Sequence, residues 1–410
     1  MPVGSFENVA FGGRDKYLTG CPQISFFRSV YRRHTNFAIE TVENTFTQIP
    51  QFGKRTSVKI PRYGDLLSQI YLYVTLPALE DNSKYYIYGV GNALIKQIDL
   101  VIGGQLIDRH YADWLNIWGE LTTPPEQLMG YDKQVGNQYN TNTGETKLYI
   151  PLRFWFNRHL GLVLPFIALQ FHDISLDIEF NTAEFISRNE LVSATTTLNA
   201  KLYSDYIFLD SDERRMLAQH RYEILIEQVQ HQSQLIPSGT LNYSIDLNFN
   251  HLGKELFWVI NSSNTDDVSL PYGTFDYSLN GSGSEHSFTT CKLQLNGYDR
   301  IYPRYADYFY LVENKHHTHQ PRTDKVHKTY VGDSFTLSTN RYRNFIYTYS
   351  FAIKPEILQP SGFCNYSTMD NIKLVFTFPT TNYNFTLHVY TTNYNILIID
   401  CGMCGLKYSS

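Results

Sequence analysis

The stretch "DLVIGGQLIDRHYADW", from Asp99 to Trp114, has a close counterpart later in the chain. The counterpart is "KLQLNGYDRIYPRYADY", from Lys292 to Tyr308. Each copy places alternating aliphatic residues before a glycine-containing turn, and each then ends in Tyr-Ala-Asp followed by an aromatic residue. Internal similarity of this kind is typical of a chain that repeats one structural unit. We therefore expect two copies of one module.

A second pair of segments matches in the same order. "ISLDIEF", from Ile174 to Phe180, aligns with "IKLVFTF", from Ile372 to Phe378. Each is preceded by an aromatic stretch that contains proline, and each is followed by another strand-like run. Since the matches keep nearly constant spacing, the repeat covers both halves of the 410-residue chain. A chain of this length can bury two ordinary cores.

Alternation of apolar and polar residues predicts that the modules are built from strands with one buried face. Three runs show it most clearly, and their expected core residues are Val58 and Ile60; Ile70, Leu72, Val74 and Leu76; and Ile174, Leu176, Ile178 and Phe180. The 32 tyrosines and 26 phenylalanines also suit pleated sheets. Short strands separated by turns and long polar loops indicate an all-β protein, either a sandwich or a jelly roll.

Helical patterning is rare, and the best case is "DSDERRMLAQHRYEILIEQ", which begins at Asp210. Asp210 or Ser211 can cap a helix there, and acidic residues in the first turn suit the helix dipole. We expect a short helix at the junction between the two halves. Gly103 and Gly104 stand between two strand-like runs and predict a hairpin turn. "DKQVGNQYNTNTGE", from Asp132 to Glu145, is expected to be a long loop.

Several functional classes find little support in the sequence. The formal charge of −5 argues against wholesale phosphate neutralisation, so we expect no sequence-specific nucleic acid. No Walker, GxSxG or HExxH motif occurs, which favours a protein that is not an enzyme and needs no cofactor. His317 and His319 could share a strand face and hold a metal, but an interface role is the more common one. Paired acids of a glycosidase cannot be recognised from sequence.

The cysteines and termini give further expectations. The five cysteines are an odd number, and no basic and apolar secretory signal precedes them, so reduced thiols in a cytosolic compartment are expected. The pair Cys401 and Cys404 has CxxC spacing but lacks nearby zinc ligands or a thioredoxin-like unit. No run of 18 apolar residues predicts a membrane helix. The glycosylation sequons are attributed to chance and begin at Asn242, Asn261, Asn280, Asn365 and Asn384.

Six long segments resemble the double jelly-roll major capsid proteins of nucleocytoplasmic large DNA viruses. The first is "YLTGCPQISFFRSVYRRHTNFAIE", from Tyr17 to Glu40. The others are "LIKQIDLVIGGQLIDRHYADWLNIWGELT" (94–122), "LYIPLRFWFNRHLGLVLPFIALQFHDISLDIEF" (148–180), "YIFLDSDERRMLAQ" (206–219), "KPEILQPSGFCNYSTMDNIKLVF" (354–376) and "YTTNYNILIIDCGMCGLKYS" (390–409). The likeness runs through almost the whole chain.

The resemblance implies two tandem eight-stranded antiparallel jelly rolls, with short helices in loops and at the junction. On this basis we expect an N-terminal arm over 1–25, a first jelly roll over 26–212, a junction with a short helix over 213–235, and a second jelly roll over 236–410. It also implies a homotrimer that serves as a pseudo-hexagonal capsomer of an icosahedral virion, assembled in the host cytoplasm. The implied partners are neighbouring capsomers, minor capsid and penton proteins, and an internal membrane.

The arm is the expected assembly element. Gly20 and Pro22 should shape it before a first strand near Phe27, and its basic residues should meet neighbouring subunits or minor capsid proteins; these are Arg28, Arg32, Arg33 and His34. Solvated charges at a strand end, with some arginine packed on aromatic rings, are the competing interpretation. A minor or paralogous capsid component, an assembly scaffold of the same fold and a carbohydrate-binding jelly roll are the alternative functions.

Overall fold

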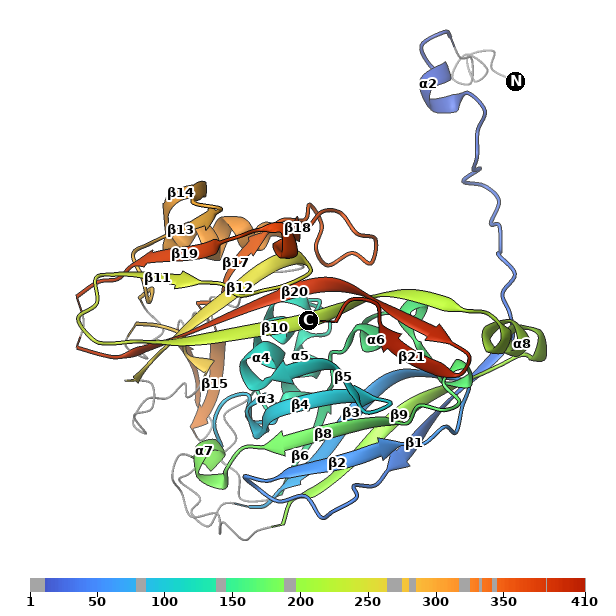
Figure 1. Ribbon diagram of the computed structural model, residues 1–410, viewed down its shortest axis with the longest axis horizontal. Coiled ribbons are helices and arrows are strands. Elements are labelled where there is room, and N and C mark those ends of the chain that lie inside the picture. Colours follow the sequence, from blue (N-terminus) through green and yellow to red (C-terminus); the bar gives the residue numbers. More distant parts are fainter. Residues whose placement is uncertain are drawn as a thin grey trace. The chain divides into compact units, whose positions relative to one another are not determined.

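The computed structural model describes residues 12–78, 86–137, 145–187, 197–263, 275–279, 285–316, 325–331, 334–340, 345–380 and 382–409 (Figure 1). The chain divides into two units, Met1–Asn36 and Phe37–Ser410. Each unit is considered by itself. The second unit contains the two sandwiches, and the first is the arm.

The first module is a sandwich of eight main strands and one short strand, β7, which all lie between Phe37 and Leu209. One sheet has the order β1-β9-β3-β6, with the short β7 added to β3, and the other has the order β2-β8-β4-β5. The strands are β1 (Phe37–Asn44), β2 (Arg55–Ile60), β3 (Leu66–Leu76), β4 (Ile95–Ile102), β5 (Gln105–Tyr111), β6 (Thr146–Pro151), β7 (Leu164–Pro165), β8 (Ile174–Phe180) and β9 (Asn199–Leu209).

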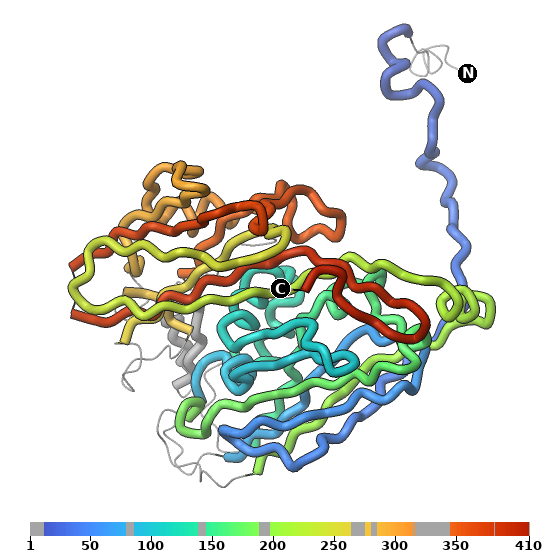
Figure 2. Tube along the Cα trace, in the orientation of Figure 1, coloured from blue at the N-terminus to red at the C-terminus, as the bar shows by residue number. Residues whose placement is uncertain are grey.

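The second module repeats this topology, with β18 in the place of β7 and with β21 as an additional strand on β20. Its sheets have the orders β10-β20-β12-β17 and β11-β19-β13-β14, and all pairings are antiparallel. The strands are β10 (Tyr222–Ile236), β11 (Asn242–Asp246), β12 (Leu252–Ser262), β13 (Thr290–Leu295), β14 (Tyr298–Tyr305), β17 (Tyr347–Ser350), β18 (Cys364–Asn365), β19 (Ile372–Thr377), β20 (Phe385–Asp400) and β21 (Met403–Leu406). The predicted double jelly roll is confirmed, and Figure 2 shows β10 and β20 running together.

The predicted core faces are also confirmed. Strand β8 alternates strictly between buried and half-buried residues, and all of its expected core side chains are buried. The expected core residues of β2 and β3 are likewise buried. The hairpin turns of the two modules match: Gly103 and Gly104 have positive φ in the first, and Asn296 and Gly297 have positive φ in the second. Positive φ at both central residues defines the type I′ turn, which fits the twist of the paired strands.

Short helices occupy the connections. At the junction, α8 (Ser211–Gln219) begins after Asp210, whose side chain accepts a hydrogen bond from the Ser211 amide, so the predicted helix is confirmed. The helices α4 (Ala112–Thr122) and α5 (Leu128–Val135) were not predicted, and α5 overlaps the start of the expected loop at Asp132. The remaining short elements are α3 (Val90–Leu94), α6 (Trp155–Arg158), η1 (Leu160–Leu162), η2 (Phe166–Ala168), α7 (Ala183–Ser187), η5 (Tyr308–Val312), η6 (Glu313–His316) and η7 (Tyr366–Thr368).

The arm unit contains one helical turn, α2 (Lys16–Thr19), and no strand among its described residues. The expectation of a first strand near Phe27 is wrong, because β1 begins at Phe37. Phe26, Phe27 and Tyr31 are exposed, so the aromatic run at this point packs into no core. A two-stranded hairpin of β15 (Lys325–Val331) and β16 (Ser334–Asn340) lies between η6 and β17 in sequence. Within the described residues, no helix is long and apolar enough to cross a membrane.

Candidate assembly surfaces

The matched topology assigns each position of one module to a position of the other. In both modules the first strand pairs with the last, and the third strand pairs with the last through a one-residue register shift. Counting along these ladders makes Tyr71 and Tyr203 equivalent to Phe257 and Tyr390. The core pairs Leu72–Leu202 and Trp258–Val389 are equivalent by the same count, and all four side chains are buried.

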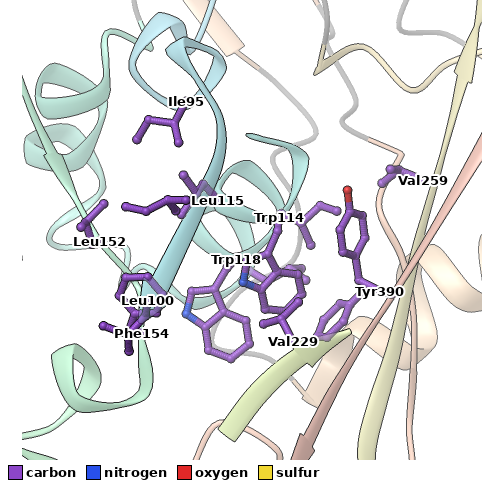
Figure 3. Packing of buried hydrophobic residues seen from close by; sticks show 14 of the residues in the cluster. Ile95, Leu100, Trp114, Leu115, Trp118, Leu152, Phe154, Val229, Val259 and Tyr390 are labelled. Atoms are coloured by element: carbon purple, nitrogen blue, oxygen red, sulfur yellow. The ribbon is translucent and has the colours of Figure 1, made fainter. Parts of the chain in front are cut away.

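The two modules meet along a surface that we call the seam. Helix α4 of the first module packs on the outer face of the β10-β20-β12-β17 sheet, and Figure 3 shows Trp114 and Trp118 between that helix and the strands carrying Val229 and Tyr390. The Trp114 ring centroid lies 5.3 Å from that of Phe257 and 5.8 Å from that of Tyr390. Such aromatic pairs stabilise beyond their buried area.

A charged group of three crosses the seam. The Glu227 carboxylate on β10 contacts Arg158 Nη1 of the first module at 2.5 Å and Lys254 Nζ on β12 at 2.8 Å. The Lys254 side chain is buried, and the Arg158 guanidinium also lies over the Trp118 ring at 4.0 Å. Burial by itself would raise the pKa of the Glu227 carboxyl, but Lys254 and Arg158 outweigh it and hold that pKa below its usual value. The carboxylate is therefore charged at neutral pH.

Backbone groups reinforce the seam at several other points. The Asp108 carboxylate accepts a hydrogen bond of 3.0 Å from the Val229 amide. The C-terminal hairpin β20–β21 reaches the first module, where the Gly402 carbonyl accepts from the Phe171 amide at 2.9 Å and His172 Nδ1 accepts from the Cys404 amide at 3.1 Å. One buried cluster includes residues of both modules, and these hydrogen bonds add to the contact between them.

A histidine pair lies on the outer face of the second module's sheet. His231 Nε2 and His388 Nδ1 are 3.1 Å apart, and the His231 ring stacks on Tyr390 at 4.5 Å and contacts Tyr111 of the first module at 4.6 Å. Burial, with His388 nearby, lowers the pKa of His231 to about 3. His231 is thus uncharged at neutral pH and is compatible with an aromatic seam.

Among the described residues, the equivalent outer face of the first module is partly exposed. Its tyrosines Tyr73, Tyr149 and Tyr203 contact one another, with the Tyr73 and Tyr149 ring centroids 4.8 Å apart, and Tyr149 is exposed. Lys201 and Glu43 occupy the positions of His388 and His231, and they form an ion pair of 2.9 Å. We call this surface the open face. A hollow of about 400 Å³ adjoins it, and Gln69, Tyr71 and Arg153 are among its lining residues.

In the first module, Tyr111 and helix α4 face the seam. The equivalent surface of the second module is exposed. Tyr305 is equivalent to Tyr111 and Val312 to Trp118, by the Tyr-Ala-Asp match. Tyr305 is 72% exposed, and Leu311 and Val312 are also exposed. We call these three residues the open edge. In its described residues, each chain therefore has one buried seam and two exposed surfaces. The open face is equivalent to one half of the seam, and the open edge is equivalent to the other half.

The structure places the four predicted arm residues on exposed backbone of the first unit. Arg28 ends a turn, and Arg32, Arg33 and His34 lie in a segment without helix or strand. The His34 ring nitrogen Nδ1 lies 2.8 Å from the Thr35 carbonyl oxygen. The four side chains share one short segment of the first unit. Sequence reasoning missed the open face and the open edge, although the second Tyr-Ala-Asp motif marks the edge.

Other candidate chemistry finds no geometric support in the described residues. They contain no group of three histidine, cysteine or acidic side chains placed to hold a metal ion. His317, His319 and the sequon at Asn280 lie outside the described residues. Cys401 and Gly402 form the tight turn between β20 and β21, both with positive φ. Burial raises the pKa of the Cys404 thiol to about 11, and a hydrogen bond to Asp400 raises that of Cys401, so neither thiol is activated.

Two jelly rolls docked in one chain define a double jelly-roll protein. Comparison with known proteins gives the same answer. Residues 25–210 match the family model described as the major capsid protein N-terminus, and residues 213–405 match that of the large eukaryotic DNA virus major capsid protein. The chain belongs to the family of major capsid proteins of large eukaryotic DNA viruses.

The relatives match the chain from end to end. The major capsid protein of Pyramimonas orientalis virus is 40% identical over 427 residues, and that of Paramecium bursaria Chlorella virus 1 is 34% identical over 460 residues, with full coverage of both chains in each case. A chain of the PBCV-1 virus capsid superimposes with a TM-score of 0.78 at 30% identity, covering 94% of this chain and 100% of that one. The Faustovirus major capsid protein shares the fold, with a TM-score of 0.71 at 10% identity over 92% of this chain and 93% of that one.

This protein is therefore a structural capsid protein of a virion. Its relatives are named as major capsid proteins and as a chain of a virus capsid.

Proposed function

We propose that three copies of this chain associate head to tail into a ring that serves as one capsomer of an icosahedral shell. The observation that carries the proposal is the pair of uncovered surfaces, the open edge of the second module and the open face of the first. Each is equivalent to one half of the seam that joins the modules within the chain. Because the two surfaces differ, the contact between them is heterologous. Repeating a heterologous contact gives a closed ring when a whole number of its rotations adds up to a full turn.

Six modules then surround one axis, alternating between first and second. A ring of six similar units gives the tile nearly hexagonal corners, which suits a lattice of close-packed tiles. The new seams should resemble the internal one, with Tyr305 of one copy against Tyr203 and the Glu43–Lys201 pair of the next. Interfaces of this permanent kind bury roughly 2,000 Å² or more. Contacts between capsomers can be weaker, since many act at once.

The mass of the protein in solution tests the ring. We expect light scattering to give about three times the 47.6 kDa chain. Replacing Tyr305 by aspartate puts a charge into the proposed seam and should yield monomers. Tyr298 is the matched control, because it lies on the same strand as Tyr305 and is 81% exposed. Its equivalent in the first module, Gln105, is exposed and not buried in the internal seam, so Tyr298 should lie outside the proposed contact. If both variants kept the mass of the parent protein, the proposed contact would be wrong.

The arm is proposed to act after the ring has formed. Arg28, Arg32, Arg33 and His34 would meet acidic or backbone groups of neighbouring subunits or of minor capsid and penton proteins, with an internal membrane as a further partner. Assembly would take place in the host cytoplasm. We propose 1–25 as an N-terminal arm, 26–212 and 236–410 as the two jelly rolls, and 213–235 as their junction. The arm unit of the structure, Met1–Asn36, continues beyond residue 25 and includes the four basic residues. Reversing charge at Arg32 and Arg33 should block shell formation and leave trimers intact; normal particles from that variant would contradict the role.

A further inference from the structure

The end of the first module carries a docking place that its own chain fills. Helix α8 follows β9 and contacts η2 there. Its Arg214 Nε lies 3.0 Å from the Asp65 carboxylate, just before β3. The Asp65 carbonyl in turn accepts a hydrogen bond of 3.0 Å from the Ile167 amide in η2. We call this place the α8 seat.

The second module has an equivalent place, but there β20 is followed by the hairpin strand β21 instead of a helix like α8. His251 precedes β12 as Asp65 precedes β3, and its carbonyl accepts a hydrogen bond of 2.9 Å from the Tyr366 amide in η7. A hollow of about 350 Å³ lies at this position. Its lining includes Leu225, His251, Leu252, Asn365, Ser367 and Tyr394, and Tyr408 after β21 borders it as well. We call this hollow the vacant seat.

The repeat indicates what should fill the vacant seat. Within the chain, α8 is the segment that leads across the internal seam into β10, the first strand of the second module. In a head-to-tail ring, the segment that leads into the next first strand is the arm that precedes β1 of the next copy. Leu225 on β10 is equivalent to Phe37 on β1, so residues 23–31 of the arm correspond to α8.

The composition of that part of the arm fits an apolar hollow. Phe26 is 89% exposed and Phe27 is 99% exposed, and Val30 and Tyr31 are exposed as well. A run of large apolar side chains without a core is a common sign of a contact surface. The vacant seat offers the complementary surface, since Leu225 is itself exposed and Leu252 is half-buried.

The backbone of the vacant seat is also unusual. His251 has a φ of 66°, in the left-handed region that residues other than glycine rarely adopt. Its amide donates a 2.9 Å hydrogen bond to Ser367 Oγ, which fixes this conformation against η7. Strained backbone conformations of this kind often occur at ligand-binding contacts.

We propose that the vacant seat of each copy binds residues 23–31 of the arm of the neighbouring copy, with Phe26 and Phe27 entering the hollow. This inference rests on the proposed ring. Within one chain, α8 connects the first module to the second. In the ring, the arm of the next copy would occupy the equivalent position between neighbouring copies, without a covalent bond to the module that it contacts.

Disulfide trapping between differently marked copies tests the exchange. One full-length chain carries Phe27→Cys, a second carries Ser367→Cys, and both carry Cys21→Ser and Cys401→Ser to remove the exposed native thiols. After the two are mixed and oxidised, we expect a cross-linked dimer on a non-reducing gel. A chain with Tyr17→Cys in place of Phe27→Cys lies outside the corresponding segment and should give little product.

The outcomes separate this inference from the proposed function. Trimers by light scattering without cross-linked dimer would overturn the arm exchange and leave the ring intact, whereas a monomer mass would overturn both. A chain carrying both cysteines that closed only on itself would also contradict the exchange. As a second readout, replacing Phe26 and Phe27 by serine should weaken trimer association by on the order of 10-fold or more for each side chain, and unchanged association would contradict the inference.

Discussion

Replacing Glu227 by glutamine should destabilise the body of the protein more than any other single charge removal on β10. The substitution keeps the size of the side chain and removes the charge that holds Arg158 and Lys254. Lys254 would then remain buried, with its nearest other carboxylate oxygen on Glu255 at 3.9 Å. Breaking a buried pair by removing one partner costs about 3–5 kcal/mol, because the other charge stays buried without compensation.

The expected shift follows from the size of the chain. Unfolding entropy of roughly 2 cal/mol/K per residue gives about 0.9 kcal/mol/K for 410 residues, so about 3 kcal/mol lowers a cooperative Tm by roughly 3 °C. Thermal unfolding followed by tryptophan fluorescence suits the experiment, since Trp118 lies beside Arg158. The readout therefore reports on the seam itself.

Glu223 provides the control on the same strand. Its carboxylate pairs with Lys407 at 3.0 Å and with Arg221 at 3.0 Å, but all three side chains are well exposed. Exposed pairs contribute little because water and salt screen them. Glu223→Gln should leave the Tm nearly unchanged. If Glu227→Gln shifted the Tm no more than Glu223→Gln does, the charged group would not stabilise the seam and the reasoning would fail.

Two further predictions concern the second module. Gly253→Ala would place a Cβ 2.0 Å from the Tyr366 ring, which is buried and whose hydroxyl is hydrogen-bonded to Thr391. We therefore expect the free energy of unfolding to fall by about 2 kcal/mol or more. An unchanged denaturant midpoint would contradict this expectation. His231 is neutral in the folded chain down to about pH 3, whereas the unfolded chain protonates it below about 6.5. Stability should therefore fall as the pH drops from 6.5 towards 3, by about 2 kcal/mol from this group at pH 5. His231→Gln should remove that part of the difference between pH 7 and pH 5, and identical pH profiles would contradict the assignment.

The fold was largely predictable because its determinants are local and occur twice. The period-two pattern of Ile174–Phe180 requires only one buried face, and the glycine turn before Tyr-Ala-Asp repeats in both modules. Helix α4 was missed although Trp114, Leu115, Trp118 and Leu121 follow helical spacing, because adjacent strand patterns and the tyrosine-rich composition favoured strands. The expectation of a first strand near Phe27 came with the family resemblance, but Phe26 and Phe27 are exposed and β1 begins at Phe37.

The assembly surfaces could not be found by the same means. Arg158, Glu227 and Lys254 are far apart in sequence, and only the docking of the modules brings them together. The open face consists of residues that look like the polar side of ordinary strands, such as Glu43 and Lys201. Their importance depends on the covered equivalents in the other module, which only the strand registers identify.

The most direct test of the account mixes two variants that each damage one half of the proposed contact. Tyr305→Asp spoils the open edge and leaves the open face intact, and Tyr203→Asp does the reverse. Each variant alone should have the 47.6 kDa mass of one chain. An equimolar mixture should form one sound contact per pair and give a dimer of about twice that mass by native mass spectrometry. Trimers from either variant alone, or a mixture that stayed entirely monomeric, would contradict head-to-tail docking.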